Sequence, residues 1–173
     1  SEDFDCRTLY GTFTDCLFIG NHAEGSNDLN HQGSGGGLHF CDTTDFHYSI
    51  LTITNCSFEN NFADKYGGGL MIEPENSFIC ENCYFIGNKA TELGGAIYIE
   101  QSLSQKFADT TITGCTFKDN DSTGSAIYFT ENKDSNSHVH ITGNCQFKTN
   151  KKNDLTHIIV RCKSIIISDI TFN

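Results

Sequence analysis

One short pattern, Cys-x-Phe-x-x-Asn, occurs five times in the 173-residue chain, always with the same internal spacing. A sixth copy begins at Ile170-Thr171-Phe172-Asn173. The five Cys residues lie 40, 27, 32 and 30 positions apart, so a constant core alternates with gaps of variable length. This arrangement indicates structural repeats joined by loops of different size. The copies are Cys16/Phe18/Asn21, Cys56/Phe58/Asn61, Cys83/Phe85/Asn88, Cys115/Phe117/Asn120 and Cys145/Phe147/Asn150.

A glycine-rich block follows four of the five copies. The glycines are expected either to adopt a positive φ or to allow close backbone approach where the wall bends. The fifth copy has Leu155-Thr156-His157 instead, so its corner is expected to differ. The four blocks are Gly35-Gly36-Gly37-Leu38, Gly67-Gly68-Gly69-Leu70, Gly94-Gly95-Ala96-Ile97 and Gly124-Ser125-Ala126-Ile127.

Each repeat contains three short segments in which apolar and polar residues alternate with period two. One precedes the Cys, as in 51–53; one is the Cys-x-Phe segment; and one follows the glycine block, as in 38–40. Such alternation predicts strands with one inward face, and helical periodicity is absent. Short strands that recur every 25–30 residues or so predict a parallel β-helix, and crossover chirality predicts a right-handed one.

The predicted fold is therefore an all-β, right-handed parallel β-helix of about five coils with three short strands per coil. Residues 1–173 are expected to form a single segment of it, part of a longer solenoid, with loops 20–34 and 131–137 projecting outward. The Cys and Phe of each copy would point inward, and the Asn would occupy a corner, in the left-handed conformation or in an amide ladder along the axis. In the strand before the Cys, Ile141 is displaced by one residue, which predicts a bulge.

The nine cysteines permit two interpretations, disulfide or redox staples, or small buried hydrophobic side chains. Parallel neighbours hold their Cβ atoms farther apart than a disulfide requires, which favours free inward thiols. Cys80 and Cys83 form a lone C-x-x-C without two further nearby ligands, so no metal site is predicted. Disulfides, if present, are expected off the main ladder, at Cys6, Cys41, Cys80 or Cys162.

The segment Phe85-Ile86-Gly87-Asn88 followed by Gly94-Gly95-Ala96-Ile97 resembles the repeats of chlamydial polymorphic outer membrane proteins, and similar repeats of parasite surface proteins. Phe58-Glu59-Asn60-Asn61 with Gly67-Gly68-Gly69-Leu70 is nearly as close. The resemblance implies a β-helical surface adhesin, in that family often the passenger of an autotransporter.

The net charge of −11 argues against nucleic acid and anionic membrane surfaces as partners, because both require basic patches. No apolar run approaches the length of a membrane span. We expect an extracellular or cell-surface module that binds a glycan or a protein, with end-to-end or lateral self-association, and no cofactor. A structural subunit of an extracellular filament or coat is the first alternative.

The outward row of the strand after the glycine block is the expected binding surface. Stacking between strands is the alternative explanation for this row. Leu17, Ile19, Tyr84 and Ile86 form a second, broken apolar patch. The row comprises His39, Met71, Tyr98, Tyr128 and Ile159, and Glu73 and Glu100 flank it.

A polysaccharide lyase or hydrolase is the second alternative, since β-helices include such enzymes. Its carboxylates would be Asp119/Asp121, Asp42/Asp45 or Glu73/Glu100, but none sits beside an evident base, so no catalytic residue is predicted. Asn55-Cys56-Ser57 and Asn120-Asp121-Ser122 fit the N-glycosylation pattern. Asn120, at a corner, is expected to be the more accessible of the two.

Overall fold

The computed structural model describes residues 9–25, 33–41, 49–73, 76–100, 109–130, 138–150, 158–159 and 164–172. All regular elements in these ranges are β-strands, and every strand pair is parallel. The described residues therefore contain no helix that could cross a membrane. The predicted loop 131–137 and residues 26–32 of the predicted loop 20–34 lie outside them.

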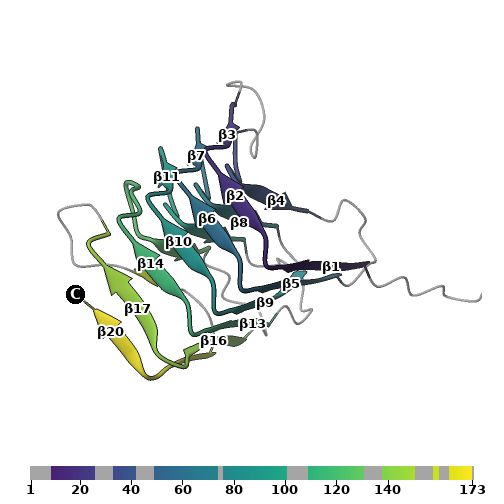
Figure 1. The fold of residues 1–173 in the computed structure, drawn as a ribbon, viewed down its shortest axis with the longest axis vertical. Helices are drawn as coiled ribbons and strands as arrows, with labels where there is room; N and C mark the ends of the chain where they lie inside the picture. Colours follow the sequence, from purple (N-terminus) through teal and green to yellow (C-terminus); the bar gives the residue numbers. More distant parts are fainter. Residues whose placement is uncertain are drawn as a thin grey trace, which may run out of the picture.

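The strands stack into four parallel sheets, numbered here in the order in which each coil visits them (Figure 1). Sheet 1 contains β1 (Leu9–Thr14), β5 (Ser49–Thr54), β9 (Asn76–Glu81), β13 (Thr110–Thr113), β16 (His138–Thr142) and β19 (Ser164–Ile167). Sheet 2 contains β2 (Leu17–Ile19), β6 (Ser57–Glu59), β10 (Tyr84–Ile86), β14 (Thr116–Lys118), β17 (Cys145–Lys148) and β20 (Ile170–Phe172). Sheet 3 contains β3 (His22–Ala23), β7 (Phe62–Ala63) and β11 (Lys89–Ala90). Sheet 4 contains β4 (Leu38–Phe40), β8 (Leu70–Ile72), β12 (Ile97–Ile99), β15 (Ile127–Phe129) and β18 (Ile158–Ile159).

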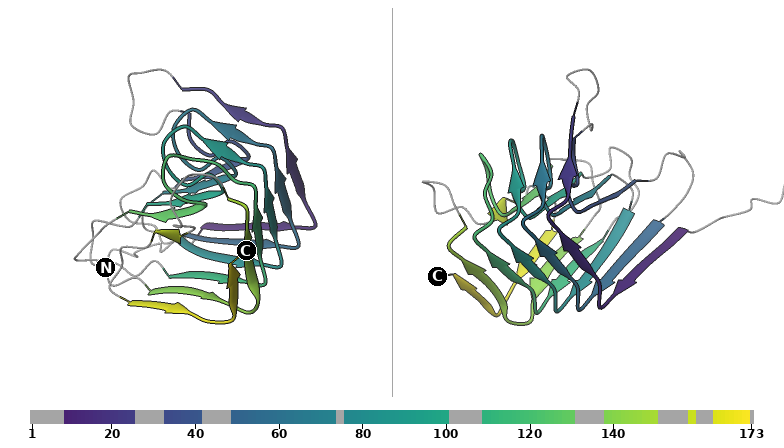
Figure 2. Two further views of the ribbon diagram at one scale, coloured as in Figure 1. Left: turned by 90° about the vertical axis from the view of Figure 1, so that its left-hand side faces the viewer. Right: turned by 45° about the horizontal axis from the view of Figure 1, so that its top comes forward.

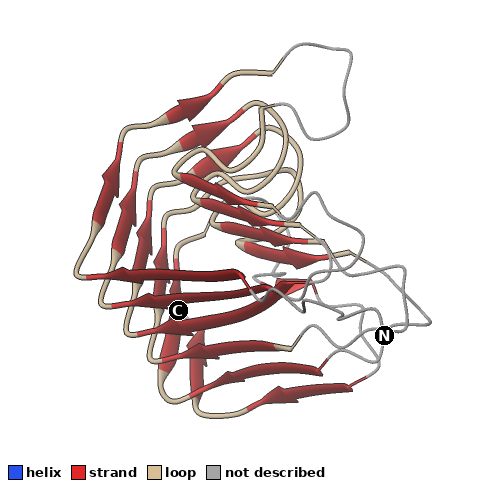
Figure 3. Cartoon of the chain, turned by 90° about the vertical axis from the view of Figure 1, so that its right-hand side faces the viewer, coloured by secondary structure: helices blue, strands red, loops and turns tan. Residues whose placement is uncertain are grey.

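The chain forms a right-handed parallel β-solenoid, as predicted. In the left panel of Figure 2 the chain runs anticlockwise while it advances toward the reader, and in Figure 3, seen from the other end, it runs clockwise while receding. The prediction of about five coils with three short strands per coil needs correction. Only the first three described coils carry the complete set of strands, and that set includes the short strands of sheet 3, which the sequence analysis missed.

The core consists of inward side chains stacked along the axis. The Phe rings of sheet 2 lie face to face, with centroids 4.5 Å apart for Phe18 and Phe58 and 4.8 Å apart for Phe58 and Phe85. The stack continues through Phe117, 5.1 Å from Phe85, to Phe147, 4.8 Å farther on. Each large apolar side chain buried in this way contributes roughly 1.5–3 kcal/mol before the entropy cost of ordering it. Since each coil covers the next, no coil is expected to be stable alone.

Strand register is unbroken at Ile141, where a bulge was predicted. Ile141 pairs directly with Ile112 on one side and with Ile167 on the other. The extra residue lies instead in the corner that follows, where Gly143 and Asn144 both have a positive φ. A corner absorbs an insertion more easily than a strand, because it has no ladder of hydrogen bonds to interrupt.

Left-handed residues mark the corners of sheet 2, but they are not the Asn residues of the repeated pattern. The residue before each pattern Cys has a positive φ, as at Asn55 and Asn82, and so does the residue before each pattern Asn, as at Asn60 and Gly87. The prediction that the pattern Asn adopts the left-handed conformation is therefore wrong: the residue one position before it does. It applies to none of the five, which are Asn21, Asn61, Asn88, Asn120 and Asn150.

In the glycine block both expected roles occur, at successive positions. Gly67 has φ +62, a conformation that side chains with a Cβ rarely adopt. A Cβ on Gly68, by contrast, would lie 2.4 Å from the carbonyl oxygen of Gly95. The first glycine of the block therefore turns the chain, and the second allows the next coil to approach closely.

Candidate functional site

The pattern cysteines form hydrogen-bonded steps at the corner between sheets 1 and 2. The backbone N–H of Cys16 donates to the sulfur of Cys56 over 3.3 Å, and the amides of Cys56, Cys83 and Cys115 each donate to the next cysteine sulfur over 3.4 Å. Each thiol in turn donates to a carbonyl oxygen just before it, as Cys83 does to Glu81 over 3.2 Å. These cysteines therefore satisfy corner amides as well as filling space.

The pattern phenylalanines have a structural role and offer no surface to a ligand in the inner coils. Phe58, Phe85, Phe117 and Phe147 have no exposed surface. Their rings therefore contact only the neighbouring coils and the core. The inward, structural position predicted for them from the sequence is confirmed, and the buried rings of Phe117 and Phe147 cannot contact a ligand from solvent.

The pattern asparagines form a second ladder at the next corner. In Asn88, Oδ1 accepts the backbone N–H of Asn61 over 3.1 Å and its side-chain amide over 2.9 Å. Its Nδ2 donates to the carbonyl of Phe58 over 2.8 Å and to Oδ1 of Asn120 over 3.0 Å. Asn88 is fully buried, so every polar atom of its amide has a partner inside the wall.

The constant spacing suggested that the five asparagines are equivalent. They are not, because the ladder has two ends. The backbone N–H and the side-chain amide of Asn21 donate to Oδ1 of Asn61 over 3.0 and 2.9 Å, yet Asn21 itself is exposed. Asn150, at the other end, is half-buried and donates to the carbonyl of Phe117 over 3.0 Å. Asn21 therefore joins the ladder without being buried in it, unlike the three asparagines between the two ends.

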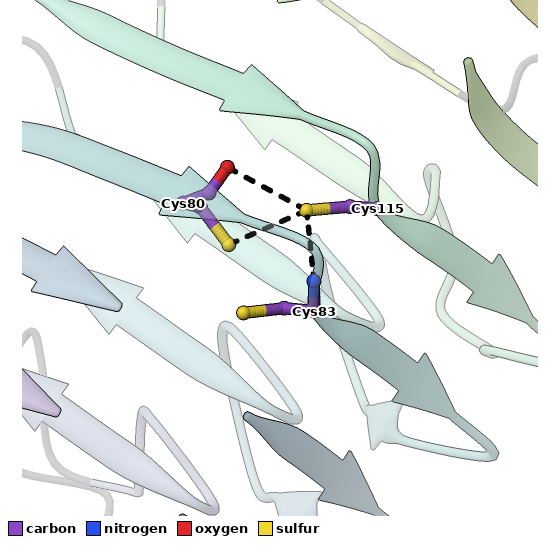
Figure 4. Close-up of side chains that lie close together, drawn as sticks. All are labelled: Cys80, Cys83 and Cys115. Atoms are coloured by element: carbon purple, nitrogen blue, oxygen red, sulfur yellow. Dashed lines mark hydrogen bonds between the residues drawn. The ribbon is translucent and has the colours of Figure 1, made fainter. Parts of the chain in front are cut away.

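Three thiols meet in the core where coils three and four join (Figure 4). The sulfur of Cys115 lies 3.6 Å from that of Cys80, and the sulfurs of Cys80, Cys83 and Cys115 all lie within 4.8 Å of one another. All three residues are buried, and none of them forms a disulfide, nor does the exposed Cys41. Cys6 and Cys162 lie outside the described residues.

Burial raises the pKa of the Cys80 thiol. Hydrogen bonds with neighbouring thiols, that of Cys145 first, raise the pKa of Cys115. The hydrogen bond from Cys115 lowers the pKa of Cys83. The three neighbouring thiols therefore differ in the direction in which their surroundings shift the pKa, upward for Cys80 and Cys115 and downward for Cys83.

The outer face of sheet 4, the expected binding surface, is largely covered. Met71 has no exposed surface and Tyr98 is only 6% exposed. Tyr98 stacks on Tyr66 at 4.6 Å and on Tyr128 at 5.8 Å, and burial raises its pKa well above the ordinary value. The expectation that Met71 and Tyr98 face solvent is thus wrong, and Tyr128 and Ile159 are half-buried. Stacking between coils explains this part of the row.

Polar groups gather at the N-terminal end of the same face. His39 Nε2 lies 2.9 Å from Glu73 Oε1, and the Cys41 sulfur lies within 4.8 Å of both donor atoms. Glu100 occupies the position of Glu73 one coil farther on, since their backbone amides donate to Ile72 and Phe40 respectively.

The outer face of sheet 2 is the more open apolar surface. Leu17 is 70% exposed, and Ile19 and Tyr84 are each 53% exposed. Ile86 is half-buried beside them. This second, broken patch of the sequence analysis therefore lies on the surface, whereas most of the preferred row does not.

The structure does not gather the candidate carboxylates into a catalytic arrangement within the described residues. Asp119 accepts a hydrogen bond from Thr149 over 2.6 Å, and Asp121 lies 4.0 Å from the ammonium of Lys89. Asp42 and Asp45 lie outside the described part of the chain.

One polar pocket, on the outer face of sheet 1, was not predicted from the sequence. His138 and His140 line this pocket of about 330 Å³ together with Asp109, Thr110 and Thr111. Asp109 Oδ1 accepts from the backbone N–H of His138 over 2.9 Å and lies 3.1 Å from its ring nitrogen. Both side chains are about half exposed, so this pair contributes little to stability.

Accessibility reverses the expected order of the two glycosylation candidates. Asn120 is 1% exposed, and its amide nitrogen donates to Phe85 and Asn150 within the ladder. Asn55 is exposed at its corner. The acceptor amide of Asn120 is therefore not available in the folded chain, whereas that of Asn55 is.

Comparison with known proteins agrees with the repeat architecture. Residues 55–73 and 82–100 match the family model of the Chlamydia polymorphic membrane protein repeat. No curated protein and no solved structure matches the chain. Each matched segment begins at a left-handed Asn and ends at the Glu that follows a strand of sheet 4, so it covers the part of one coil that runs through sheets 2, 3 and 4 and includes its pattern Cys and Asn. The chain thus contains two repeats of the Chlamydia polymorphic membrane protein type, as its sequence predicted.

Proposed function

We propose that this chain is a surface-displayed or secreted β-helix module, without enzymatic activity, that binds another protein through the outer face of sheet 2. The observation that carries the proposal is the exposure of Leu17 and Ile19 on the first coil and of Tyr84 two coils farther on, in an otherwise polar face. The repeat it contains is named for a membrane protein family, which supports display at a surface.

The arrangement of the patch favours a protein over a glycan. Leu17, Ser57 and Tyr84 are in register, as are Ile19, Glu59 and Ile86, so the apolar side chains lie on both sides of one polar coil. Ser57 donates a 2.6 Å hydrogen bond to Glu59, which partly satisfies the intervening carboxylate. Aliphatic and aromatic groups around a satisfied polar centre are typical of protein interfaces, whereas sugars are held mainly by aromatic faces and hydrogen bonds.

Cell binding tests this proposal. Labelled chain is added to a panel of cultured cell types, and the double variant Leu17→Ser/Tyr84→Ser is compared with the natural chain. We expect the variant to bind at least about tenfold more weakly, the effect of losing one well-buried anchor. Tyr10→Ser, which removes a 68% exposed aromatic from sheet 1, is the matched control and should bind normally.

Pretreatment of the cells separates the two partner classes. Protease treatment should abolish binding, and periodate oxidation of glycans should leave it intact. Equal binding by the double variant, or loss after periodate alone, contradicts the proposal. The second outcome would support a glycan ligand instead.

A further inference from the structure

We propose that His39, Cys41 and Glu73 form a binding site for a divalent transition metal of the zinc class, on the outer face of sheet 4 where its first two strands end. The proposal is independent of the protein-binding function above, because it concerns a different face and different residues. It also goes beyond the sequence analysis, which predicted no metal site.

The backbone brings the three residues together. His39 and Cys41 are two positions apart in an extended segment, so their side chains leave the wall on the same side. Glu73 belongs to the next coil, and its amide donates to the carbonyl of Phe40 over 3.0 Å, between His39 and Cys41. Because Phe40 and Ile72 are paired in register within the sheet, both chain segments are held in place at this point.

The donor atoms are close to coordination geometry. His39 Nε2 and Glu73 Oε1 are 2.9 Å apart, and both lie within 4.8 Å of the Cys41 sulfur. Ligands around a tetrahedral zinc ion at 2.0–2.3 Å lie roughly 3.3–3.8 Å from one another. Side-chain rotations that move the donor atoms of Cys41 and Glu73 by about 1 Å would therefore bring all three ligands to coordination distance.

Burial is graded across the site in a way that suits a metal with one open position. The side chains of His39 and Glu73 are 29% and 18% exposed, whereas Cys41 is exposed. Three protein ligands with a fourth position open to water or a partner's side chain is the arrangement found in exchangeable and catalytic zinc sites. The mixture of nitrogen, sulfur and oxygen donors favours Zn²⁺ or Co²⁺ over Ca²⁺ and Mg²⁺.

Charge balance distinguishes this site from the buried thiols. A neutral His39, a Cys41 thiolate and a Glu73 carboxylate carry two negative charges, which one dication neutralises. Metal binding then releases the single Cys41 proton to solvent. In the core, three thiolates of Cys80, Cys83 and Cys115 around the same ion would leave one negative charge among apolar side chains, which is costly.

Cobalt titration is the test, because a thiolate bound to Co²⁺ gives a charge-transfer absorption in the near ultraviolet. The reduced, purified chain is titrated with CoCl₂ and then with ZnCl₂. We expect one equivalent of Co²⁺ per chain, with the thiolate band, displaced by one equivalent of Zn²⁺. Cys41→Ser should abolish the band. His39→Gln and Glu73→Gln should each weaken binding by more than about 100-fold, the upper range for loss of a group that only supports a ligand.

Two control variants make the result decisive. His22→Gln removes a comparable exposed pair, His22 with Asp64 at 2.8 Å, and should leave cobalt binding unchanged. Cys80→Val removes one thiol of the buried cluster at a position that lies between Ile53 and Ile112 in the sheet. This variant should also bind cobalt normally. A thiolate band that survives Cys41→Ser, or that disappears in Cys80→Val while the circular dichroism stays native, overturns the proposal.

Discussion

The backbone N–H of Cys83 donates a hydrogen bond to the sulfur of Cys115 in the next coil, over 3.4 Å. At this corner the chain turns from sheet 1 into sheet 2, and the amide would otherwise be buried without a partner. The same step recurs at the preceding and following coils. A thiol is small enough to fit inside the wall and is able to accept this hydrogen bond, which explains why cysteine rather than valine or alanine recurs here.

Removing one sulfur of this ladder should lower the free energy of unfolding more than removing a neighbouring sulfur that accepts no hydrogen bond from a corner amide. Cys115→Ala leaves the Cys83 amide unsatisfied, which costs about 1–3 kcal/mol in addition to the cavity. Cys80→Ala is the control, because among the described hydrogen bonds its sulfur meets only the Cys115 sulfur. Urea denaturation of both variants measures the difference, and equal losses would show that the corner hydrogen bond contributes nothing.

The amide ladder should be equally sensitive. Asn88→Leu deletes a fully buried amide that makes four hydrogen bonds, so we expect a loss of about 3–5 kcal/mol in the free energy of unfolding. Asn82→Gly is the control, since Asn82 is exposed at φ +53 and glycine adopts that conformation without cost. This control should stay within about 0.5 kcal/mol of the natural chain. A tolerated Asn88→Leu would refute the ladder.

Tyr98 should behave as a core residue and not as a surface ligand contact. Tyr98→Ala removes an aromatic side chain packed between Tyr66 and Tyr128, with an expected loss of about 3–5 kcal/mol. Tyr84→Ala, at an exposed position of sheet 2, should change stability by less than about 0.5 kcal/mol. If thermal melts show the reverse order, the assignment of the two faces is wrong.

Acid should weaken the contact that ties the first coil to the second beside sheet 3. The backbone N–H of Gly25 and then His22 lower the pKa of Asp64 below its ordinary value of 3.8. Because the folded pKa is the lower one, the contribution is present above the unfolded pKa and is lost as the pH falls through the folded value. Asp64→Asn should therefore flatten the dependence of stability on pH below about pH 4. An unchanged slope would contradict this coupling.

Glycosylation provides a separate test of burial. In a host that glycosylates, folded and secreted chain should carry glycan at Asn55 and none at Asn120. Intact mass should fall by one glycan in Asn55→Gln and should not change in Ser122→Ala, which removes the second acceptor pattern while leaving Asn120 in place. Glycan at Asn120 in folded protein would mean that this Asn lies outside the ladder.

Much of the fold follows from the sequence because a solenoid repeats one local solution. The inward Cys and Phe, the parallel pairing and the glycine corners all follow from residues that recur at fixed spacing. The short strands of sheet 3 were missed because two residues such as Phe62-Ala63 are too few to show alternation. Identical spacing also hides the difference between Asn21, at an exposed end of the ladder, and the buried Asn88.

The surface was harder to predict. Alternation places Met71 and Tyr98 outside the sheet, but it does not show that they are covered. The approach of His39 and Cys41 to Glu73 joins positions more than 30 residues apart, and their register depends on a gap of variable length. Spacing along the chain therefore predicted the sheets of the solenoid, but not which outward side chains are covered or which of them approach one another across coils.

Native-state hydrogen exchange at the corners tests the central claim most directly. Corner amides ordinarily exchange quickly, but those of Cys56, Cys83, Asn61 and Asn88 donate to side chains of the next coil. Measured residue by residue by NMR, these amides should exchange as slowly as those in the middle of β5 and β9, with opening free energies close to that of global unfolding. Exchange at the rate of unprotected loop amides would show that the repeated Cys and Asn do not hold the coils together.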